Sequence, residues 1–561
     1  MALLLVLTVL LPLVGSLTLF ARPQLPTRSA RALALGFAGA TMGLSLLLLL
    51  AFRPEQVGPQ FSFVDEAGKL GLAWLPKYGI RFALGLDGIS LWLYLLTSLL
   101  MITSVFASWE SVEERAPAHY GLLLALQAGL LGLFSSLDVV LFYICFEFTL
   151  IPLFFLIGLY GGPDRRRASV TIFLYTLAGS LLTLIGVVAL VAVHYQHTSP
   201  NVLTFSIPEL TEGLRNLSWP EWTQPVAWGD WRLGRSFWTT PQVLIFLLLF
   251  AGFATKVALF PFHSWLPLSY VEAPTAGSIL LAGVMLKVGS YGFLRFNMAM
   301  TPMGAQALYP LVATLAVIGI LYGALAALAQ ADLKRLVAYS SLSHTGFIVL
   351  GLFCLNATGI DGAVIQMFNH GLTTGALFAC VGMIQERYHT RDMAELGGLW
   401  NRLPSWAFFL ILAAMGSAAL PGLNGFVGEF PILLGMFRTD RTLAVFATLG
   451  MILGAYPLLL MIQKVVFGPL KEPGVYGDDP GRSLGGIRPL GWHEIAGLTP
   501  LMVLIVLIGI HPKPFLDRIQ PPLRPIVAQF MKIQSAAVAG QGPAIPSPIA
   551  AAPAASAVVV H

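Results

Sequence analysis

Long uninterrupted apolar runs dominate the chain, and its polar residues gather in the short segments between them. A helix needs about 20 apolar residues to cross roughly 30 Å of membrane hydrocarbon. The runs are continuous rather than alternating, which favours helices over the strands of a β-barrel. The pattern therefore predicts an all-α polytopic membrane protein with about 14 transmembrane helices. The predicted spans are 2–20, 33–52, 89–109, 118–136, 138–160, 168–194, 241–260, 273–296, 307–330, 335–356, 362–386, 404–434, 442–468 and 495–510.

Composition agrees with this pattern and excludes other classes of protein. Only 11% of the 561 residues are charged and 57% are hydrophobic, whereas soluble proteins carry about 25% charged residues. A soluble enzyme or a disordered chain is therefore excluded. The excess of 32 basic over 27 acidic residues is spread over the loops, so we expect no nucleic-acid partner. Lipid is the expected surrounding.

The positions of the runs predict the domain organisation. The apolar N-terminus has no basic residue ahead of it, so we interpret it as an uncleaved first span rather than a signal peptide. The predicted parts are three spans with an outer loop (1–110), a first inverted repeat of spans four to eight (118–296), a second of spans nine to thirteen (307–468), a last span with a C-terminal segment (495–535) and a disordered Ala/Pro-rich tail (536–561).

The charges of the short loops predict the orientation. Loops after odd-numbered spans hold twelve Lys or Arg residues, and the opposite short loops hold three. Because basic loops stay on the cytoplasmic side, both termini are expected on the non-cytoplasmic face of a bacterial inner membrane. Loop 195–240, with five tryptophans, would lie on that outer face, either at headgroup depth or as a docking surface for a partner.

Several ionisable residues stand alone inside otherwise uncharged spans. A charge at the bilayer centre costs at least about 2.5–3.5 kcal/mol, and such residues usually mark ion or proton paths. We therefore expect each to be paired or to change its protonation state. The candidates are Glu147, Lys256, Lys287, His344, His370 and Glu429, with His263 and Lys464 as secondary candidates.

Structural roles remain open for some of these candidates. Lys464 near a helix end could extend its amine to water, and a membrane histidine such as His344 or His370 could join two helices through a hydrogen bond. Proline breaks the spans that hold Lys256 and Glu429, at Pro261 and at Pro421. Ionisable residues beside broken helices in two corresponding halves are typical of inverted-repeat transporters.

No sequence motif indicates a cofactor on this chain. Cys145, Cys354 and Cys380 are scattered through apolar runs, which is unlike the grouped cysteines of iron–sulfur or zinc sites. A dinucleotide-binding glycine motif and an HExxH run are also missing from the sequence. The sequence therefore offers no recognisable site for a redox cofactor on this chain.

The motifs around the broken seventh span resemble a known family. Residues 263–267 read His-Ser-Trp-Leu-Pro and residues 272–278 read Glu-Ala-Pro-Thr-Ala-Gly-Ser. Together with the runs 281–287, 332–344 and 389–393, this pattern is similar to the antiporter-like membrane subunits of complex I, the NADH-quinone oxidoreductase. The sequence resembles the M-type chain most, because it has Glu429 at a position where the L- and N-type paralogues and cation/proton antiporters usually carry lysine. The family often has Asp-Ala-His where this sequence has Leu268-Ser269-Tyr270, so an entry role of His263 is not carried over.

The resemblance implies a function and partners. It implies that the chain moves protons along a midplane row of Glu, Lys and His residues, driven by redox chemistry on other subunits. Flavin, iron–sulfur clusters and quinone would belong to those partner subunits. Glu147 would pair with Lys256, whose proton would pass Lys287, His344 and His370 to Glu429. The implied partners are the L- and N-type chains and the small K-, J-, A- and H-type chains. Alternatives are a subunit of a multi-chain Na+/H+ antiporter or membrane-bound hydrogenase, and a scaffold that transports nothing.

Overall fold

A computed structural model describes residues 1–66, 68–197, 203–217, 226–228, 231–233, 240–473 and 487–538, and it is overwhelmingly helical. Among these residues, eleven helical segments are long and apolar enough to cross a membrane. They are α1 (Ala2–Phe20), α2 (Thr27–Ala51), α3 (Gly88–Ala107), α4 (Ala116–Ser135), α5 (Val139–Phe148) with α6 (Leu150–Tyr160), α7 (Arg165–His197), α12 (Thr275–Leu280) with α13 (Leu286–Gly292), α14 (Pro302–Leu328), α16 (Ala357–Tyr388), α19 (Arg441–Met461) and α20 (Trp492–Ile510).

The other three predicted spans are also helical. One is α15 (Leu333–Leu352), which is less apolar than the eleven. The second is divided into α10 (Pro241–Val257) and α11 (Trp265–Glu272), and the third into α17 (Pro404–Ser417) and α18 (Asn424–Thr439). The described chain therefore has a helical element at each of the fourteen predicted spans. The broken seventh span extends beyond its predicted end at residue 260, because α11 continues the path after the break.

The two breaks are built in similar ways. Each first half ends near a left-handed alanine, Ala258 with φ 58° and Ala419 with φ 56°. Proline follows both, at Pro261 and Pro421, and cannot donate a backbone hydrogen bond to continue the helix. Backbone groups at such a break must find protein partners inside a membrane; the Trp265 indole donates to the Thr255 carbonyl at 2.9 Å.

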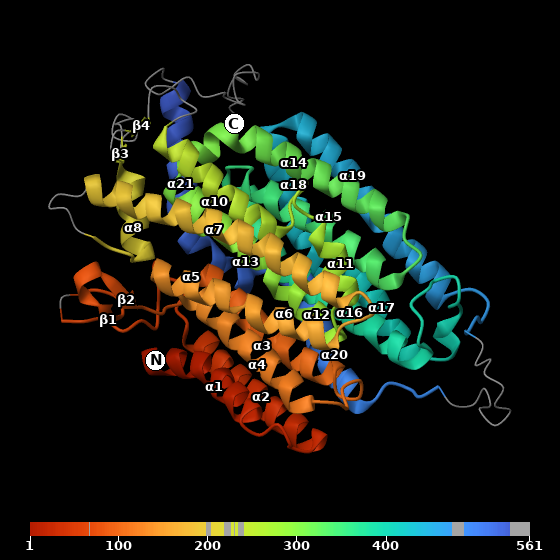
Figure 1. The fold of residues 1–561 in the computed structure, drawn as a ribbon. Helices are drawn as coiled ribbons and strands as arrows, with labels where there is room; N and C mark the ends of the chain where they lie inside the picture. Colours follow the sequence, from red (N-terminus) through yellow and green to blue (C-terminus); the bar gives the residue numbers. More distant parts are fainter. Residues whose placement is uncertain are drawn as a thin grey trace.

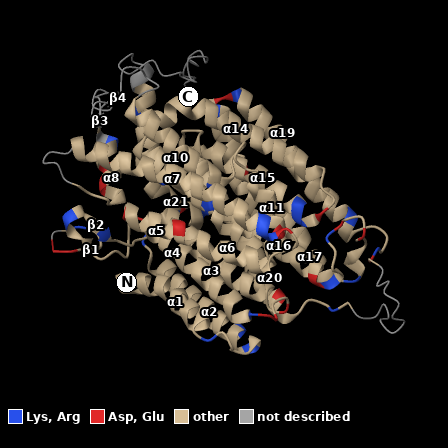
Figure 2. Ribbon diagram, in the orientation of Figure 1, with Lys and Arg blue, Asp and Glu red and all other residues tan. Residues whose placement is uncertain are grey.

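The helices form one packed body (Figure 1), and the most apolar stretches of α16 and of the α12–α13 segment are buried inside it. At one flank α1 packs on α2 and α4, and at the opposite flank α19 packs on α14 (Figure 1). The outward faces of α1, α2 and α19 carry exposed Leu, Val, Ile and Phe side chains. Figure 2 shows Lys, Arg, Asp and Glu concentrated at helix ends and loops, with few inside the body. The flanks are therefore apolar surfaces suited to lipid or to neighbouring membrane chains.

Small elements decorate the ends of the bundle. Residues 53–87 contain a hairpin of β1 (Leu72–Leu75) and β2 (Ile80–Phe82) around a short 3-10 helix, Pro76–Tyr78. The Trp-rich loop contains α8 (Ile207–Asn216) and a second hairpin, β3 (Val226–Trp228) with β4 (Trp231–Leu233). Its remaining tryptophans lie outside the described residues. Another 3-10 helix covers Leu399–Asn401.

The chain continues after α20 into a further helix, α21 (Lys513–Val538). Its Phe515 ring packs on Trp92 of α3 and Phe368 of α16, so α21 lies against the centre of the bundle. The pattern of apolar runs predicts no span over this segment. The predicted disordered tail lies outside the described residues except for 536–538, which continue α21.

Candidate functional site

Glu429 of α18 is buried inside the bundle and lies at hydrogen-bond distance from side chains of two neighbouring helices. Its side chain is 1% exposed. His344 Nδ1 lies 2.6 Å from Glu429 Oε1, and Gln366 Nε2 donates to the same oxygen at 3.0 Å. The other ring nitrogen of His344 lies 3.2 Å from Ser417 Oγ. This end of the site is thus a buried carboxylate with a histidine that can share its proton.

Lys287 of α13 forms the next contact of the same kind. Its amine is buried and lies 2.7 Å from His370 Nδ1 of α16. It also donates to the carbonyl of Ala282 at 2.5 Å. Ala282 lies in a short π-helix, Leu281–Met285, directly before Lys287. Such wider turns occur often at functional sites, because they redirect backbone groups within a helix.

The two contacts are joined by the histidines. The rings of His344 and His370 are 5.9 Å apart, centroid to centroid, and tilted by 46°. His370 Nε2 is buried and makes no hydrogen bond among the described residues. Lys287, His370, His344 and Glu429 therefore form a continuous row across α13, α16, α15 and α18, which we call the central row. One water between the rings would be enough to connect it for a proton.

The remaining pair, Glu147 and Lys256, is arranged differently. Lys256 of α10 is 2% exposed, and its amine makes no hydrogen bond among the described residues. It lies 4.3 Å from the ring centre of Phe146. The half-buried Glu147 is the next residue of α5, and its Oε1 is buried without a hydrogen-bond partner. In the described chain the two charges interact but form no ion pair within 4.0 Å. The pairing implied by the resemblance is therefore present only as an interaction beyond ion-pair distance.

Close helix packing places Lys256 near the start of the central row. Gly289 of α13 lies so close to Phe253 and Val257 of α10 that an added Cβ would come within 2.7 Å of both residues. Lys256 precedes Val257, and Lys287 lies two residues before Gly289. The two lysines thus lie on helices in direct contact.

The secondary candidates lie apart from this arrangement. His263 lies in the break between α10 and α11, where its ring packs on Phe260 and Tyr322. Its Nδ1 is buried and makes no hydrogen bond within the part of the chain that the structure describes. Lys464 is exposed at the end of the α19 path, in a short π-helix, Ile462–Val466. The structure therefore agrees with the alternative in which Lys464 reaches water at a helix end.

Uncharged polar residues of the site were not found from the sequence. Gln366, Asn369, His370 and Thr373 lie on one face of α16, at the i, i+3, i+4, i+7 spacing. Gln366 binds Glu429, and Asn369 Nδ2 donates to the Asn424 carbonyl at 2.7 Å, which fixes the start of α18. The sequence signal for these residues is a stripe of polar side chains along one face of an otherwise apolar span. Charge alone does not reveal such a stripe, because most of its members are uncharged.

Comparison with known proteins assigns the fold to a family. Residues 136–454, more than half of the chain, match the model described as NADH:quinone oxidoreductase/Mrp antiporter, transmembrane. NADH-quinone oxidoreductase subunit M of Rhodobacter capsulatus is 40% identical over 503 residues, which cover 90% of this chain and 91% of the relative. The chain belongs to this family. The resemblance to the M-type subunits read from the sequence is thereby confirmed.

Solved structures agree with this assignment. A chain of the respiratory complex I from Thermus thermophilus with bound NADH superposes with a TM-score of 0.78 at 31% identity, covering 94% of this chain and 99% of that one. A chain of the Mrp complex from Dietzia sp. superposes with a TM-score of 0.73 at 20% identity, covering 96% and 100%. The second likeness shows the shared fold alone. The polytopic membrane fold predicted from the sequence is confirmed by the first.

Proposed function

We propose that this chain moves protons across a membrane as a subunit of an NADH-quinone oxidoreductase. The observation that carries the proposal is the central row, in which four protonatable side chains are buried one beside the next on α13, α16, α15 and α18. Buried ionisable groups of this kind are costly unless they bind or pass an ion. Proton passage suits them, because each has a neighbour able to accept the proton directly or through one water.

The mechanism follows from the electrostatics of the row. A carboxylate near Lys256 favours its ammonium form, and moving Glu147 away favours release of the proton. The released proton passes through Lys287, His370 and His344 to Glu429, which delivers it to the other face. Moving one charge against 100 mV requires about 2.3 kcal/mol, and forming or separating one buried charge pair can supply an energy of this size.

The free energy for this movement comes from other subunits in the proposed assembly. The similarity to relatives named NADH-quinone oxidoreductase subunit M supports an assembly in which other subunits transfer the electrons. Flavin, iron–sulfur clusters and quinone would be bound by those other subunits. The wide separation of the three cysteines supports this division. We further propose L- and N-type chains and the small K-, J-, A- and H-type chains as neighbours, on the apolar flanks of α1, α2 and α19.

The proposed orientation and repeat organisation rest on the loops and breaks. Twelve basic residues against three in the short loops support outward termini in a bacterial inner membrane. Similar breaks at Ala258 and Ala419 support inverted repeats of residues 118–296 and 307–468. One repeat then opens toward each side of the membrane, with the central row between them.

The test is the variant Glu147→Gln in the assembled complex. Gln keeps the size of the side chain but cannot favour the ammonium of Lys256 by charge. We expect complex assembly and electron transfer to an artificial acceptor to persist, and NADH-driven proton pumping into vesicles to fall at least about tenfold, the effect of a pKa change of one unit. The exposed Glu55→Gln is the matched control. Normal pumping with Glu147→Gln would contradict the mechanism and favour a scaffold role.

A further inference from the structure

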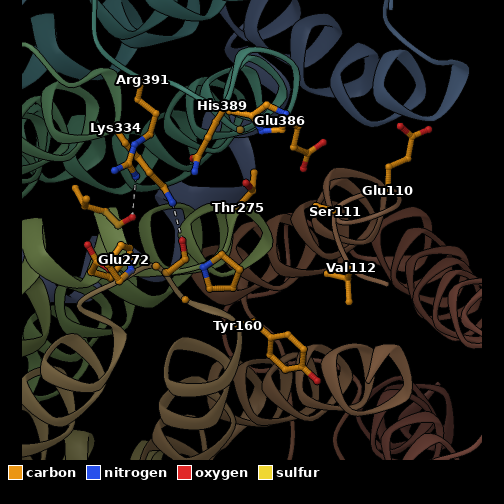
Figure 3. Close-up of a pocket in the computed structure, with 18 of the residues that line it drawn as sticks. Glu110, Ser111, Val112, Tyr160, Glu272, Thr275, Lys334, Glu386, His389 and Arg391 are labelled. Carbon is orange, nitrogen blue, oxygen red and sulfur yellow. Dashed lines mark hydrogen bonds between the residues drawn. The ribbon is translucent and has the colours of Figure 1, made fainter. Parts of the chain in front are cut away.

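Three lysines are buried within the described part of the chain, and two of them have hydrogen-bond acceptors. Figure 3 shows Lys334 at the wall of a cavity of about 720 Å³, where its amine donates to the Ala273 carbonyl at 2.6 Å. The Lys287 amine has a backbone carbonyl and the His370 ring as partners. Lys256 is equally buried, but its amine has no acceptor among the described residues. Because a buried ammonium without an acceptor is costly, Lys256 needs one that approaches in another state of the chain.

The carboxylate of Glu147 is the acceptor that Lys256 can reach, and it has a second partner. The two charges interact, but in the described chain they lie beyond ion-pair distance. The same carboxylate interacts with the hydroxyl of Tyr143, which lies four residues earlier on α5. Side chains four residues apart lie on the same face of a helix. Glu147 is thus shared between an ammonium on α10 and a hydroxyl on its own helix.

The hydroxyl of Tyr143 also has two possible acceptors. It donates to the Ser180 carbonyl of α7 at 3.4 Å, which is long beside the usual O–H···O distance of about 2.7–2.8 Å. A tyrosine hydroxyl carries one proton, so it donates fully to only one acceptor at a time. A hydrogen bond to an ionised carboxylate is roughly twice as strong as one between neutral groups. A small displacement of α5 is therefore enough to transfer the donation from Ser180 to Glu147.

Close packing of α7 on α10 fixes the acceptor of Tyr143 relative to the amine of Lys256. A Cβ added at Gly179 of α7 would clash with Thr255 of α10. Small residues at such a crossing let two membrane helices approach closely. Ser180 directly follows Gly179 in the chain. Lys256 directly follows Thr255. A displacement of α5 against this pair of helices therefore changes the contacts of Tyr143 and of its neighbour Glu147 together.

Tyr143 and Glu147 lie where a neighbouring chain can act on them. Both side chains are partly exposed, and Ile144 on the same helix is 44% exposed. This face of α5 therefore borders lipid or another membrane chain rather than the interior of the bundle. A contact on it can displace α5 without first moving the helices of the central row.

We propose that Tyr143 is the positioning residue that sets which partner the Glu147 carboxylate takes. In one state the hydroxyl donates to the carboxylate and holds it away from Lys256. In the other state the hydroxyl donates to Ser180, and the carboxylate is free to pair with the ammonium. The described structure lies between these states, with a long Tyr143–Ser180 contact and with the charges of Glu147 and Lys256 apart. The proposal concerns the control of the proposed function and rests on it. Only hydrogen bonds are exchanged, so no co-reactant is needed.

The test is the variant Tyr143→Phe in the assembled complex, which removes one oxygen atom and keeps the ring. Without the hydroxyl, Glu147 stays with Lys256 and hinders the release of its proton. We expect electron transfer to an artificial acceptor to persist and NADH-driven pumping into vesicles to fall about threefold, the effect of losing one hydrogen bond of ordinary strength. The matched control is Tyr175→Phe, because Tyr175 lies at the surface of α7 with its hydroxyl 2.8 Å from Ser264 Oγ. Pumping in Tyr143→Phe equal to that of the control would overturn the proposal.

Infrared spectroscopy distinguishes a positioning role from a loss of packing. The redox-induced difference spectrum of the native complex should contain a carboxylate band that disappears in Glu147→Gln. In Tyr143→Phe this band should remain and change its frequency, because the carboxylate has lost one donor. An unchanged band, or no such band in the native complex, would overturn the positioning role.

The variant Glu147→Gln also separates this proposal from the proposed function. The double variant Tyr143→Phe/Glu147→Gln should pump as Glu147→Gln does, because Tyr143 acts only through the carboxylate. A further loss in the double variant would show that Tyr143 acts elsewhere. If Glu147→Gln loses pumping while Tyr143→Phe pumps normally, Tyr143 has no positioning role and the proposed function stands. If both variants pump normally, both proposals are wrong.

Discussion

Each end of the candidate site places a glutamate near a basic side chain, but the hydrogen bonding at the two ends differs. At one end Glu429 is fully enclosed, with His344 Nδ1 and Gln366 Nε2 on one carboxylate oxygen. At the other end Lys256 and Glu147 interact across a gap, and Lys256 Nζ and Glu147 Oε1 are both without a hydrogen bond in the described chain. A satisfied buried acid is stable in place, whereas an unsatisfied buried base is close in free energy to losing its charge. The comparison suggests that the Lys256 end responds to an outside signal and the Glu429 end receives what it releases.

The largest effect on proton pumping is expected from replacing Glu429, the hydrogen-bonded carboxylate. In Glu429→Gln the side chain keeps its size and one acceptor oxygen for Gln366, but it cannot take up a proton from His344. NADH-driven pumping should fall at least about tenfold in the purified complex in vesicles, the scale typical of a lost proton-transfer group. The exposed Glu66→Gln controls for the loss of one negative charge. Pumping above half of the native rate in Glu429→Gln would mean that the proton leaves by another residue.

The two ends of the site are also expected to differ in how substitutions there change the thermal stability of the protein. Lys256→Met removes a buried ammonium that lacks a hydrogen bond, and replacing such a charge by an apolar group of similar volume is often neutral or stabilising. Glu429→Leu removes the hydrogen-bond partner of two buried nitrogens, His344 Nδ1 and Gln366 Nε2, which costs about 1–3 kcal/mol for each. We therefore expect opposite signs, with an unchanged or higher unfolding temperature for Lys256→Met and a lower one for Glu429→Leu.

The measurement is the thermal unfolding of the detergent-solubilised complex, followed at this subunit by exposure of a buried cysteine. Cys380 is fully buried in α16, the helix that also carries His370. A thiol-reactive dye reports the temperature at which it becomes accessible. The control is Leu498→Met, a buried change in α20 away from the row. A fall of similar size in both variants would show that the two ends do not differ in the way described here.

The fold followed from the sequence almost completely, and the physical reason is the membrane. Lipid requires every spanning segment to satisfy its own backbone, so apolar length alone located the helices. Helix α21 was missed because its prolines and charges give no apolar run, and its packing on Trp92 and Phe368 is visible only in three dimensions. The π-helix before Lys287 was missed as well, since hydropathy does not report the width of a helical turn.

The site was predicted in part, for a similar reason. Charged residues in apolar spans are visible in a sequence because they are costly, and four of them do meet in the central row. The polar residues that hold them, such as Gln366, cost less and are less visible. The sequence does not show which ionisable side chains are in direct contact. The Glu147–Lys256 pair expected from the resemblance has no contact within ion-pair distance in the described chain, whereas Lys287 and His370 are at hydrogen-bond distance, which the sequence did not predict.

The smallest effect is expected at Lys464, which tests whether burial rather than residue type defines the site. Lys464 stands alone in its apolar run, as Lys256 does, yet its side chain is exposed at the end of the α19 path. Its ammonium can therefore stay hydrated, and no proton needs to pass it. In Lys464→Met we expect pumping within a factor of two of native, measured beside Lys256→Met in the same vesicles. A loss as large as that of Lys256→Met would show that the proton path continues to the exposed end of α19, and that a lone charge in an apolar span predicts function even where water reaches it.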